Sequence, residues 1–221
     1  MKTVAFIPVK QTSKRVRSKN FRSFCGVPLY QWFLRKLSDG AVPFDEIYVD
    51  TDSDEVADYA IAHGLRHLPR DPKLAEDTAN GNDLLVYEAE NVIADVYVQL
   101  FITAPLLRPD TIRTAIEIIA NRVEYDSLFT AVRRYSWFWF DGAPVNYDPK
   151  VLPRSQDALP VIQETTGLYA IRRDVLLERR CRIGYNPYML FVNDTEAVDI
   201  DTEEEFKLAE FWYSQRQELS Q

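Results

Sequence analysis

The chain has 221 residues, 46% of them hydrophobic, so it is long enough to bury one sizeable core, and we expect a single domain over 1–221. Its formal net charge of -8 disfavours nucleic acid as a partner, because an acidic surface repels the phosphate backbone. No apolar run approaches the roughly 18 residues of a membrane span, no signal-peptide pattern is present, and the cysteines form no C-x-x-C motif, so we expect a cytoplasmic protein without a membrane partner.

The first predicted element is a short buried strand over residues 4–7, where an apolar run suits a parallel sheet covered on both faces. Pro8 is expected to end this strand, and a cationic loop follows. Residues 1–38 hold nine cations and no carboxylate, so residues 39–221 sum to -17. A loop at this position of an α/β sheet is where such folds bind ligands, and its cations favour a polyanion, most simply a phosphate ester. The alternative is a solvated basic loop.

The middle of the chain alternates helical and strand patterns. Ser53 or Asp54 is a candidate cap for one helix, and Gly64 is expected to end it. Strands that alternate with helices predict a parallel sheet with right-handed crossovers. The predicted helices are 29–37, 54–63, 81–93 and 110–122, and the predicted strands are 47–49, 65–68 and 96–102.

The pattern changes after residue 126. Two β-like runs, 128–132 and 137–140, lie on either side of a pair of arginines, and the following segment is rich in Pro, Asp and Asn. We interpret 133–160 as an inserted lobe, either a substrate lid or a subunit contact, because Trp137 and Trp139 would be exposed on a monomer. A homodimer formed through this lobe is the resulting hypothesis.

The final part of the chain contains a pair of carboxylates. In a strand, Asp199 and Asp201 point to the same face while Ile200 packs inward. Such a pair suits Mg²⁺, which takes one or two carboxylates together with substrate phosphates. The alternative is that these acids complement the dipole of the next helix, which Thr202 and Glu205 open as a capping box. The predicted strands here are 167–171, 189–192 and 197–200, and the predicted helices are 174–179 and 203–219.

Motifs that follow one another along nearly the whole chain resemble those of a known family. Residues 7–20, I-P-V-K-Q-T-S-K-R-V-R-S-K-N, match I-P-A-R-G-G-S-K-G-I-P-G-K-N without gaps. The other matches are 26–29 with G-x-P-L, 50–52 with S-T-D, 70–77 with R-P-x-x-L-A-x-D, 103–106 with T-S-P-L, 154–157 with R-R-Q-D, 166–169 with N-G-x-x-Y, and 199–202 with D-I-D-T. In their order and spacing they resemble the N-acylneuraminate cytidylyltransferase (CMP-sialic acid synthetase) family, which activates 2-keto sugar acids with CTP.

The resemblance implies a fold and a reaction. The fold is an α/β, Rossmann-like (GT-A-like) nucleotidyltransferase, a three-layer α/β/α sandwich with a small β-rich lobe for dimerisation or as a lid. The reaction is a direct displacement, in which a hydroxyl of a small acidic acceptor attacks the α-phosphorus of CTP and pyrophosphate leaves. The resemblance also places Mg²⁺ on Asp199 and Asp201.

Individual motif residues acquire expected roles from the same resemblance. Lysines are expected to neutralise the phosphates, with Asn20 and Ser13 adding hydrogen bonds, and an arginine suits the carboxylate of the acceptor. The catalytic candidates are Lys14, Lys19 and Asp201. The nucleotide-binding candidates are Pro8, Lys10, Ser13, Lys14, Asn20, Arg70, Asp77, Phe101 and Thr103. The acceptor-binding candidates are Arg154, Gln156, Thr166, Gly167 and Tyr169.

Departures from the family motifs leave two alternatives open. The cationic loop has no glycine, although in the family backbone amides approach the triphosphate there. Phe101 stands where relatives have a glutamine that helps to read the base, and Thr166 replaces an asparagine. One alternative therefore keeps the fold but changes the acceptor, for example to a phosphonate, or changes the nucleoside triphosphate. The other is a binding or regulatory protein that has lost catalysis, which the intact Asp-Ile-Asp motif, Lys14 and Lys19 disfavour.

Overall fold

The computed structural model describes residues 1–13, 16–76 and 78–218, without the side chains of 217 and 218. Two residues with expected roles, Lys14 and Asp77, lie outside this described part. All positions below belong to it.

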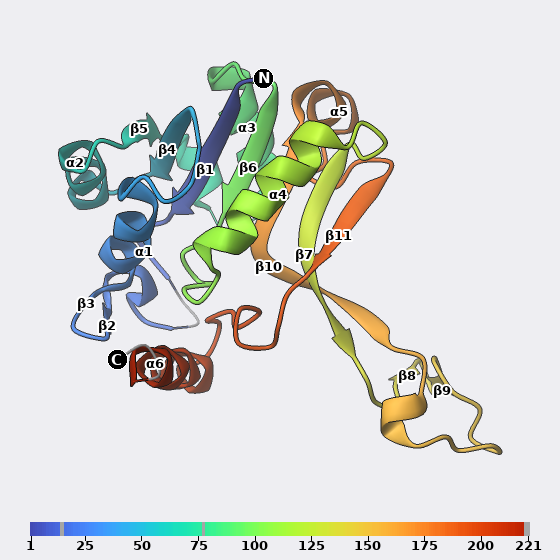
Figure 1. Cartoon of the computed structure of the whole chain (residues 1–221). Helices are drawn as coiled ribbons and strands as arrows, with labels where there is room; N and C mark the ends of the chain where they lie inside the picture. Colours follow the sequence, from blue (N-terminus) through green and yellow to red (C-terminus); the bar gives the residue numbers. More distant parts are fainter. Residues whose placement is uncertain (14–15, 77, 219–221) are drawn as a thin grey trace.

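One mixed sheet forms the centre of the molecule. Its strands are β1 (Thr3–Val9), β4 (Glu46–Thr51), β5 (Arg66–Pro69), β6 (Val96–Leu100), β7 (Ser127–Arg134), β10 (Val161–Arg172) and β11 (Pro187–Phe191). Among the described residues these seven strands lie in the order β11-β7-β10-β6-β1-β4-β5 (Figure 1). β1 is parallel to β4 and β6, β5 is parallel to β4, and β11 is parallel to β7.

The predicted parallel pairing is confirmed for β1, β4, β5 and β6, whereas β10, from the later part of the chain, runs antiparallel to both β6 and β7. β7 and β10 are consecutive long strands of this sheet, and the chain between them leaves the main body and returns beside the strand that it left (Figure 1). A chain that returns in this way must pair antiparallel, whereas a parallel neighbour needs a crossover. Arg133 and Arg134, where the predicted lobe begins, therefore belong to β7 of the main sheet.

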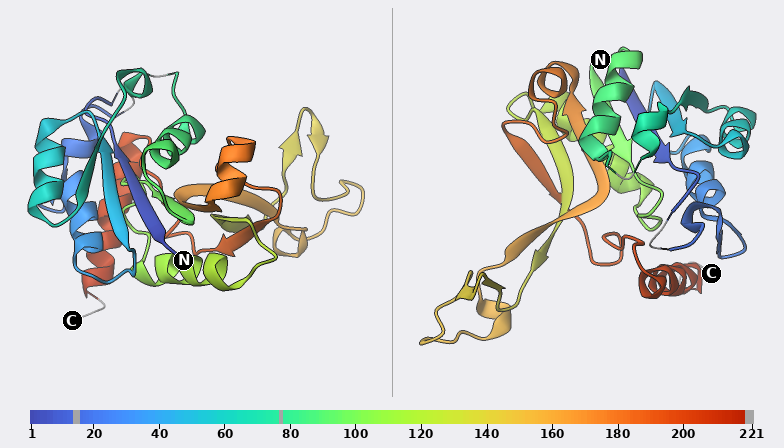
Figure 2. Two further views of the ribbon diagram at one scale, coloured as in Figure 1. Left: turned by 90° about the horizontal axis from the view of Figure 1, so that it is seen from above. Right: turned by 180° about the vertical axis from the view of Figure 1, so that it is seen from behind.

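Helices cover both faces of the sheet (Figure 2). They are α1 (Leu29–Ser38), α2 (Asp54–Ala62), α3 (Gly81–Asn91), α4 (Pro109–Asn121), α5 (Arg173–Arg179) and α6 (Glu203–Glu218). Adjacent residues of β1 point to opposite faces, so Ile7 packs with α1, α2 and α4, while Phe6 packs with α3 and α5. α6 packs at one end of the sheet, against Phe24 and Leu106. The predicted three-layer α/β/α architecture is confirmed.

Two further local predictions are wrong. Pro8 lies within β1, where it pairs with Asp50 of β4, whereas the pairing of β1 with β6 reaches only to Phe6. With a partner on one side only, this end of the strand resembles an edge, where proline is tolerated. Residues 197–200 form no strand; their apolar side chains are covered because Ile200 and Val198 pack against the cluster under α6.

Several predicted helix boundaries are confirmed. The side chain of Ser53 caps α2 by accepting from the Val56 N–H, and Gly64, with φ +75°, follows its end. At α6 the Glu205 N–H donates to Thr202 Oγ1 at 3.2 Å, while Glu205 Oε2 accepts from the Thr202 N–H at 2.8 Å. This reciprocal pair is the predicted capping box.

Residues 135–160, which we call the lobe, project from the main body between β7 and β10 (Figures 1 and 2). The lobe holds β8 (Trp139–Phe140), β9 (Ala143–Pro144) and the 3₁₀ helix η3 (Ser155–Asp157). The remaining short elements are η1 (Lys19–Phe21), β2 (Ser23–Phe24), β3 (Val27–Pro28) and η2 (Pro72–Ala75). None of the helices in the described chain combines the length and apolarity needed to cross a membrane. Cys25 and Cys181 are free thiols.

Candidate functional site

The carboxyl ends of β1, β4, β5 and β6 meet at one edge of the sheet, because these strands are parallel. Lys10, Arg70 and Phe101 are the residues that directly follow β1, β5 and β6. They line a cavity of about 300 Å³, which we call the lysine cavity. Its lining comprises Pro8, Lys10, Thr12, Ser13, Lys19, Asn20, Arg70, Leu74, Glu76, Ala79, Leu84, Phe101, Ile102 and Thr103.

The structure brings all the described nucleotide-binding candidates together in this lining, from three separate parts of the sequence. Two of them already make hydrogen bonds within the cationic loop. Ser13 Oγ donates to the Val16 carbonyl at 2.7 Å and accepts from the Lys19 N–H at 2.8 Å, and Asn20 Nδ2 donates to the Lys10 carbonyl at 2.6 Å. Side chains thus hold this glycine-free loop in shape.

Ser18 adopts a backbone conformation that glycine would adopt more easily. Its φ of 53° lies in the left-handed region, where a residue with a Cβ is disfavoured by roughly 1–2 kcal/mol. Glycine stands at this place in the family motif and takes the conformation without that penalty. Hydrogen bonds of the Lys19 N–H to Ser13 and of the Phe21 N–H to the Ser18 carbonyl hold the serine in this conformation.

A second cavity, of about 460 Å³, contains the paired carboxylates, and we call it the aspartate cavity. Asp199 and Asp201 both line it, together with Thr166. They do so without the predicted strand, because the buried Ile200 anchors the segment and its N–H donates to the Thr103 carbonyl at 2.8 Å. The full lining is Arg134, Gln163, Glu164, Thr165, Thr166, Asp194, Ala197, Val198, Asp199, Asp201, Glu205, Leu208 and Trp212.

Lys19 connects the two cavities. It lines the lysine cavity, and its Nζ donates to the Ile200 carbonyl at 2.5 Å and lies 3.3 Å from Asp201 Oδ1. Its side chain is only 10% exposed, so this contact is screened less by water than a surface ion pair would be. Segments 181 residues apart in sequence therefore meet at one point.

Gly167 and Tyr169 lie behind the cavity walls rather than in them. A Cβ on Gly167 would lie 3.2 Å from Ala104 Cβ, so glycine here permits close packing of β10 on the loop after β6. The Tyr169 hydroxyl donates to Glu164, and the guanidinium of Arg182 lies 3.6 Å from the centre of its ring. Burial raises the pKa of the Tyr169 phenol further above its ordinary value. Tyr169 is thus a buried residue that packs behind the cavity and does not line it.

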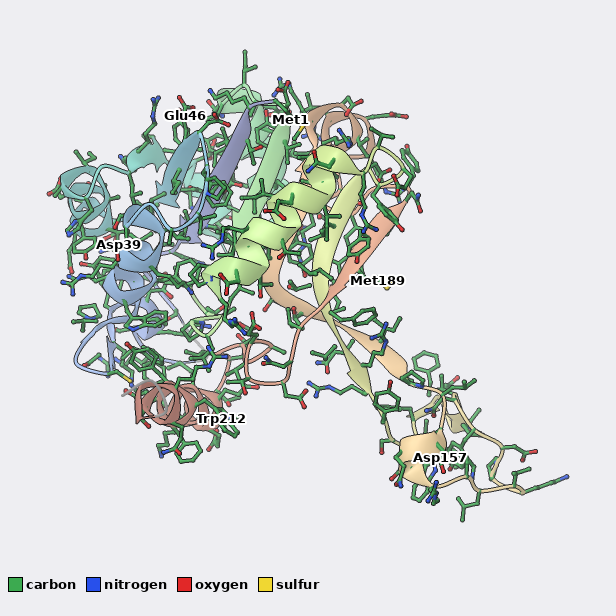
Figure 3. The ribbon with its side chains drawn as sticks, in the orientation of Figure 1. Met1, Asp39, Glu46, Asp157, Met189 and Trp212 are labelled. Carbon is green, nitrogen blue, oxygen red and sulfur yellow. The ribbon has the colours of Figure 1, made fainter. Side chains whose placement is uncertain are left out.

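Arg154 and Gln156 lie on the lobe and line neither cavity of their own chain. Both are exposed, and Arg154 Nε lies 2.5 Å from Asp157 Oδ2. Figure 3 shows Asp157 on the projecting lobe and Trp212 on α6 beside the main body. The expected acceptor side is therefore divided between two separate parts of the molecule.

Arg134 is a site residue that sequence reasoning missed. It lines the aspartate cavity, donates to Gln163 Oε1 at 2.8 Å and forms an ion pair with Asp194. The arginine pair at 133–134 is visible in the sequence, but only the pairing of Arg134 with Val161 of β10 places it beside the cavity. Among the described residues that line this cavity, Arg134 is the one cation, and the same lining contains Glu164, Asp199 and Asp201.

Comparisons with known proteins show the family of the chain. A family model described as "Cytidylyltransferase" matches residues 4–218. The chain is 28% identical over 215 residues to N-acylneuraminate cytidylyltransferase A of Danio rerio, and 30% identical to N-acylneuraminate cytidylyltransferase of Oncorhynchus mykiss. These alignments cover 93% of the chain but 49% of each relative, so the chain spans about half the length of these relatives.

A relative of similar length also matches: the pseudaminic acid cytidylyltransferase of Campylobacter jejuni is 26% identical over 227 residues, covering 96% of the chain and 97% of the relative. Among solved structures, CMP:2-keto-3-deoxy-manno-octonic acid synthetase complexed with CTP superposes with a TM-score of 0.73 at 20% identity, over 98% of this chain and 100% of that one. A 4-diphosphocytidyl-2C-methyl-D-erythritol synthase of Anaerococcus prevotii gives 0.70 at 11% identity, over 96% of both chains. These likenesses establish the fold. With the family model covering nearly its whole length, the chain belongs to the cytidylyltransferase family.

Proposed function

We propose that the protein transfers CMP from CTP to a small acidic sugar of the 2-keto sugar acid class and releases pyrophosphate. Lys19 carries this assignment, because it lines the lysine cavity and contacts Asp201 of the aspartate cavity. A triphosphate in the first cavity and an acceptor in the second would meet beside this ammonium group. The names of the relatives, which act on N-acylneuraminate and pseudaminic acid, support the acceptor class.

The lysine cavity is suited to hold the triphosphate. Lys10 and Lys19 supply positive charge, and charge-assisted hydrogen bonds from ammonium groups to phosphate oxygens are among the stronger ones in proteins. Because this charge is built into a partly enclosed wall, it can stabilise the negative charge that develops on the departing pyrophosphate. The structured loop, braced by Ser13 and Asn20, keeps the two lysines in place.

The acidic pair fits Mg²⁺. Asp199 Oδ1 is buried without a hydrogen-bond donor, which is costly for a carboxylate oxygen unless a cation accompanies it. Within the described chain no group of three or more His, Cys, Asp or Glu side chains could hold a metal, so Asp199 and Asp201 would share the ion with substrate phosphates, as Mg²⁺ commonly does. Bound there, Mg²⁺ would neutralise charge on the phosphate oxygens.

The transfer needs no covalent enzyme intermediate. A hydroxyl oxygen of the acceptor forms the new bond to the α-phosphorus, and the bond from that phosphorus to the bridging oxygen of pyrophosphate breaks. The hydroxyl proton passes to a carboxylate at the edge of the aspartate cavity, for which Asp201 is the candidate. Arg134 is suited to the acceptor's carboxylate, because it is the cation in this otherwise acidic part of the described lining.

A different nucleoside triphosphate is the second candidate function. Phe101 lines the lysine cavity, and its ring packs edge-on against Tyr169 with 6.3 Å between ring centres. It offers a face for stacking, which every base accepts, and no hydrogen bond to a base edge. Base selection must then come from other groups of the cavity.

A homodimer is the proposed assembly. The lobe exposes Trp137 by 42%, Trp139 by 57% and Phe140 by 79%, a cluster of aromatic side chains that is unusual on a monomer. Since Arg154 and Gln156 line no cavity of their own chain, we propose that the lobe carries them to the acceptor side of a second copy. The free thiols agree with the expected cytoplasmic location.

Release of pyrophosphate tests the proposed function directly. The assay combines each nucleoside triphosphate with a panel of 2-keto sugar acids and phosphonates, with and without Mg²⁺. We expect release only with CTP, a keto sugar acid and Mg²⁺. Release with another nucleotide or with a phosphonate would move the assignment to the second candidate, and no release from any pair would contradict the enzyme.

Lys19→Met provides the matched variant for this assay. Removing the ammonium should lower kcat/KM by roughly 100-fold, as loss of one preorganised donor commonly does. Arg17→Met, an exposed cation of the same loop, is the control and should change kcat/KM little. Equal effects of the two variants would show that only the net charge of the loop matters.

A further inference from the structure

A buried polar network lies behind the wall of the lysine cavity. Arg70 lines that cavity, yet its side chain is only 3% exposed and is held by Asp50, which is fully buried. Arg70 Nε donates to Asp50 Oδ1 at 3.0 Å, and Arg70 Nη2 donates to the Asp50 carbonyl at 2.9 Å. The guanidinium at the cavity wall is therefore fixed from behind by one residue of β4.

A second buried carboxyl, that of Glu88 on α3, contacts Asp50 within hydrogen-bonding reach. Asp50 Oδ2 and Glu88 Oε1 are both buried, and neither receives a hydrogen bond. Two ionised carboxylates side by side would repel each other and leave both oxygens unsatisfied. A single proton on Glu88 turns the contact into an O–H group that donates to the Asp50 carboxylate.

The surroundings of Glu88 favour this protonated form. Burial and the neighbouring Asp50 charge raise the pKa of Glu88 well above its ordinary value. The groups that face it are Asp50 from β4, Arg70 from the chain after β5 and Gln99 from β6, whose Nε2 donates to Glu88 Oε2 at 3.5 Å and to the Gly81 carbonyl at 3.2 Å. Arg182 lies against Gly81, on the same side as the side-chain oxygen of Gln99.

The proton sets the charge of the whole network. With Glu88 neutral, Arg70 and Asp50 sum to zero, and the guanidinium presents N–H donors without net charge at the cavity wall. With Glu88 ionised, the network carries a buried net negative charge beside the place proposed for a triphosphate. That charge repels the nucleotide and also competes for the Arg70 guanidinium.

We propose that Glu88 is a positioning residue for nucleotide binding: its protonated carboxyl donates to Asp50 and thereby fixes Arg70 at the wall of the lysine cavity. Arg70 then meets an uncharged part of the nucleotide, the base or the ribose, while the phosphates lie with Lys10 and Lys19. This inference rests on the proposed function only for the identity of the nucleotide. The chain-specific feature is Asp50, which stands where the family motif has a serine.

The test compares Glu88→Gln and Glu88→Ala with the wild-type chain, using CTP binding measured by calorimetry from pH 6 to pH 9. Glutamine keeps an uncharged donor, so Glu88→Gln should bind as the wild type does at neutral pH and should lose none of this affinity at alkaline pH. The wild type should bind progressively more weakly as Glu88 ionises. Glu88→Ala should bind about tenfold more weakly than the wild type does at neutral pH, since it removes the donor to Asp50, and its affinity should not change as Glu88 ionises in the wild type. Glu90→Gln, an exposed carboxylate of the same helix, is the matched control.

Two results would overturn the inference: an alkaline loss of CTP affinity that is the same in Glu88→Gln as in the wild type, or unchanged affinity in a folded Glu88→Ala. If Glu88→Ala does not fold, the comparison of Glu88→Gln with the wild type across the pH series is sufficient to test the inference. The carboxyl ¹³C signal of Glu88 should report a protonated acid at neutral pH, and an ionised one would also contradict the inference.

Failure of the wild type to bind CTP or any other nucleoside triphosphate overturns the proposed function and this inference together. Turnover that is indifferent to Glu88 overturns the inference alone.

Discussion

The ammonium group of Lys19 lies where two parts of the site meet. It is nearly buried, and its partners are a backbone carbonyl and a carboxylate from the opposite end of the chain. A buried cation with such partners is oriented before any ligand arrives, which is the condition for strong electrostatic stabilisation of a developing charge. At the same scale, the Asp50 and Glu88 carboxyls are buried together without donors to all of their oxygens, which is why we propose that Glu88 holds a proton.

The raised pKa of Glu88 predicts how stability depends on pH. The folded protein holds a proton that the unfolded chain loses above about pH 4.3. The contribution of Glu88 is therefore fully present below that pH and is lost as pH rises toward the higher folded pKa, by up to about 1.4 kcal/mol per pH unit. Urea unfolding at several pH values should show that Glu88→Gln gains stability relative to the wild type with rising pH. Parallel curves for the two proteins would contradict the protonated carboxyl.

At the scale of elements, the start of α6 fixes the position of a site residue. Glu205 Oε2 accepts from the Asp201 N–H at 2.8 Å as well as from the Thr202 N–H. The capping box therefore also holds the backbone of Asp201. The Ile200 N–H is bonded to the loop after β6 at the same time. A helix cap and a loop carbonyl together hold the aspartate pair, in place of the predicted strand.

Thr202→Ala tests this role of the cap. Loss of the Thr202 hydroxyl removes the acceptor for the Glu205 N–H and should lower the free energy of unfolding by about 1 kcal/mol. Because Asp201 is held by the same cap, the Mg²⁺ concentration that gives half-maximal pyrophosphate release should rise. Glu204→Ala, an exposed neighbour outside the capping box, is the control. If both variants unfold in urea at the same midpoint as the wild type, the cap does not hold this end of the helix.

At the scale of the whole molecule, the projecting lobe distinguishes the chain from a compact sandwich. Two long strands, β7 and β10, lead into it (Figure 1), and its aromatic side chains Trp137, Trp139 and Phe140 are exposed. Some of them bond within the lobe: Trp137 Nε1 donates to the Pro153 carbonyl and Trp139 Nε1 to the Tyr147 hydroxyl, both at 2.9 Å. Their rings remain exposed, so the lobe is an ordered apolar surface suited to a second copy of the chain.

Light scattering measures the proposed assembly. We expect the wild-type chain to be a dimer at micromolar concentration, and Trp139→Glu combined with Phe140→Glu to be a monomer, because carboxylates cannot be buried unpaired in an apolar interface. Ile61→Glu, an equally exposed apolar residue on α2, should leave the dimer intact. A monomeric wild type would contradict the assembly. The monomeric double variant should also lose turnover if the lobe completes the acceptor side of a partner.

Local order along the chain was predictable because it depends on near neighbours. The apolar run that leads into β1, the end of α2 at Gly64 and the capping box at Thr202 each depend on residues a few positions apart. The motif order likewise indicated the family, and placed Lys19 and Asp201 at one site. The direction of β10 was not predictable, because a buried strand shows the same apolar pattern whichever way it runs.

The remaining features were decided by tertiary contacts. Residues 197–200 read as a strand because they are apolar, but their burial comes from packing under α6 rather than from a sheet ladder. Arg134 lines the aspartate cavity because β7 pairs with β10 beside it. Arg154 does not line either cavity of its own chain because it lies on the lobe. The sequence by itself determined which residues carry charge and which helices and strands can form. Only the fold decided which charges meet, because burial and long-range pairing, not spacing along the chain, set their distances.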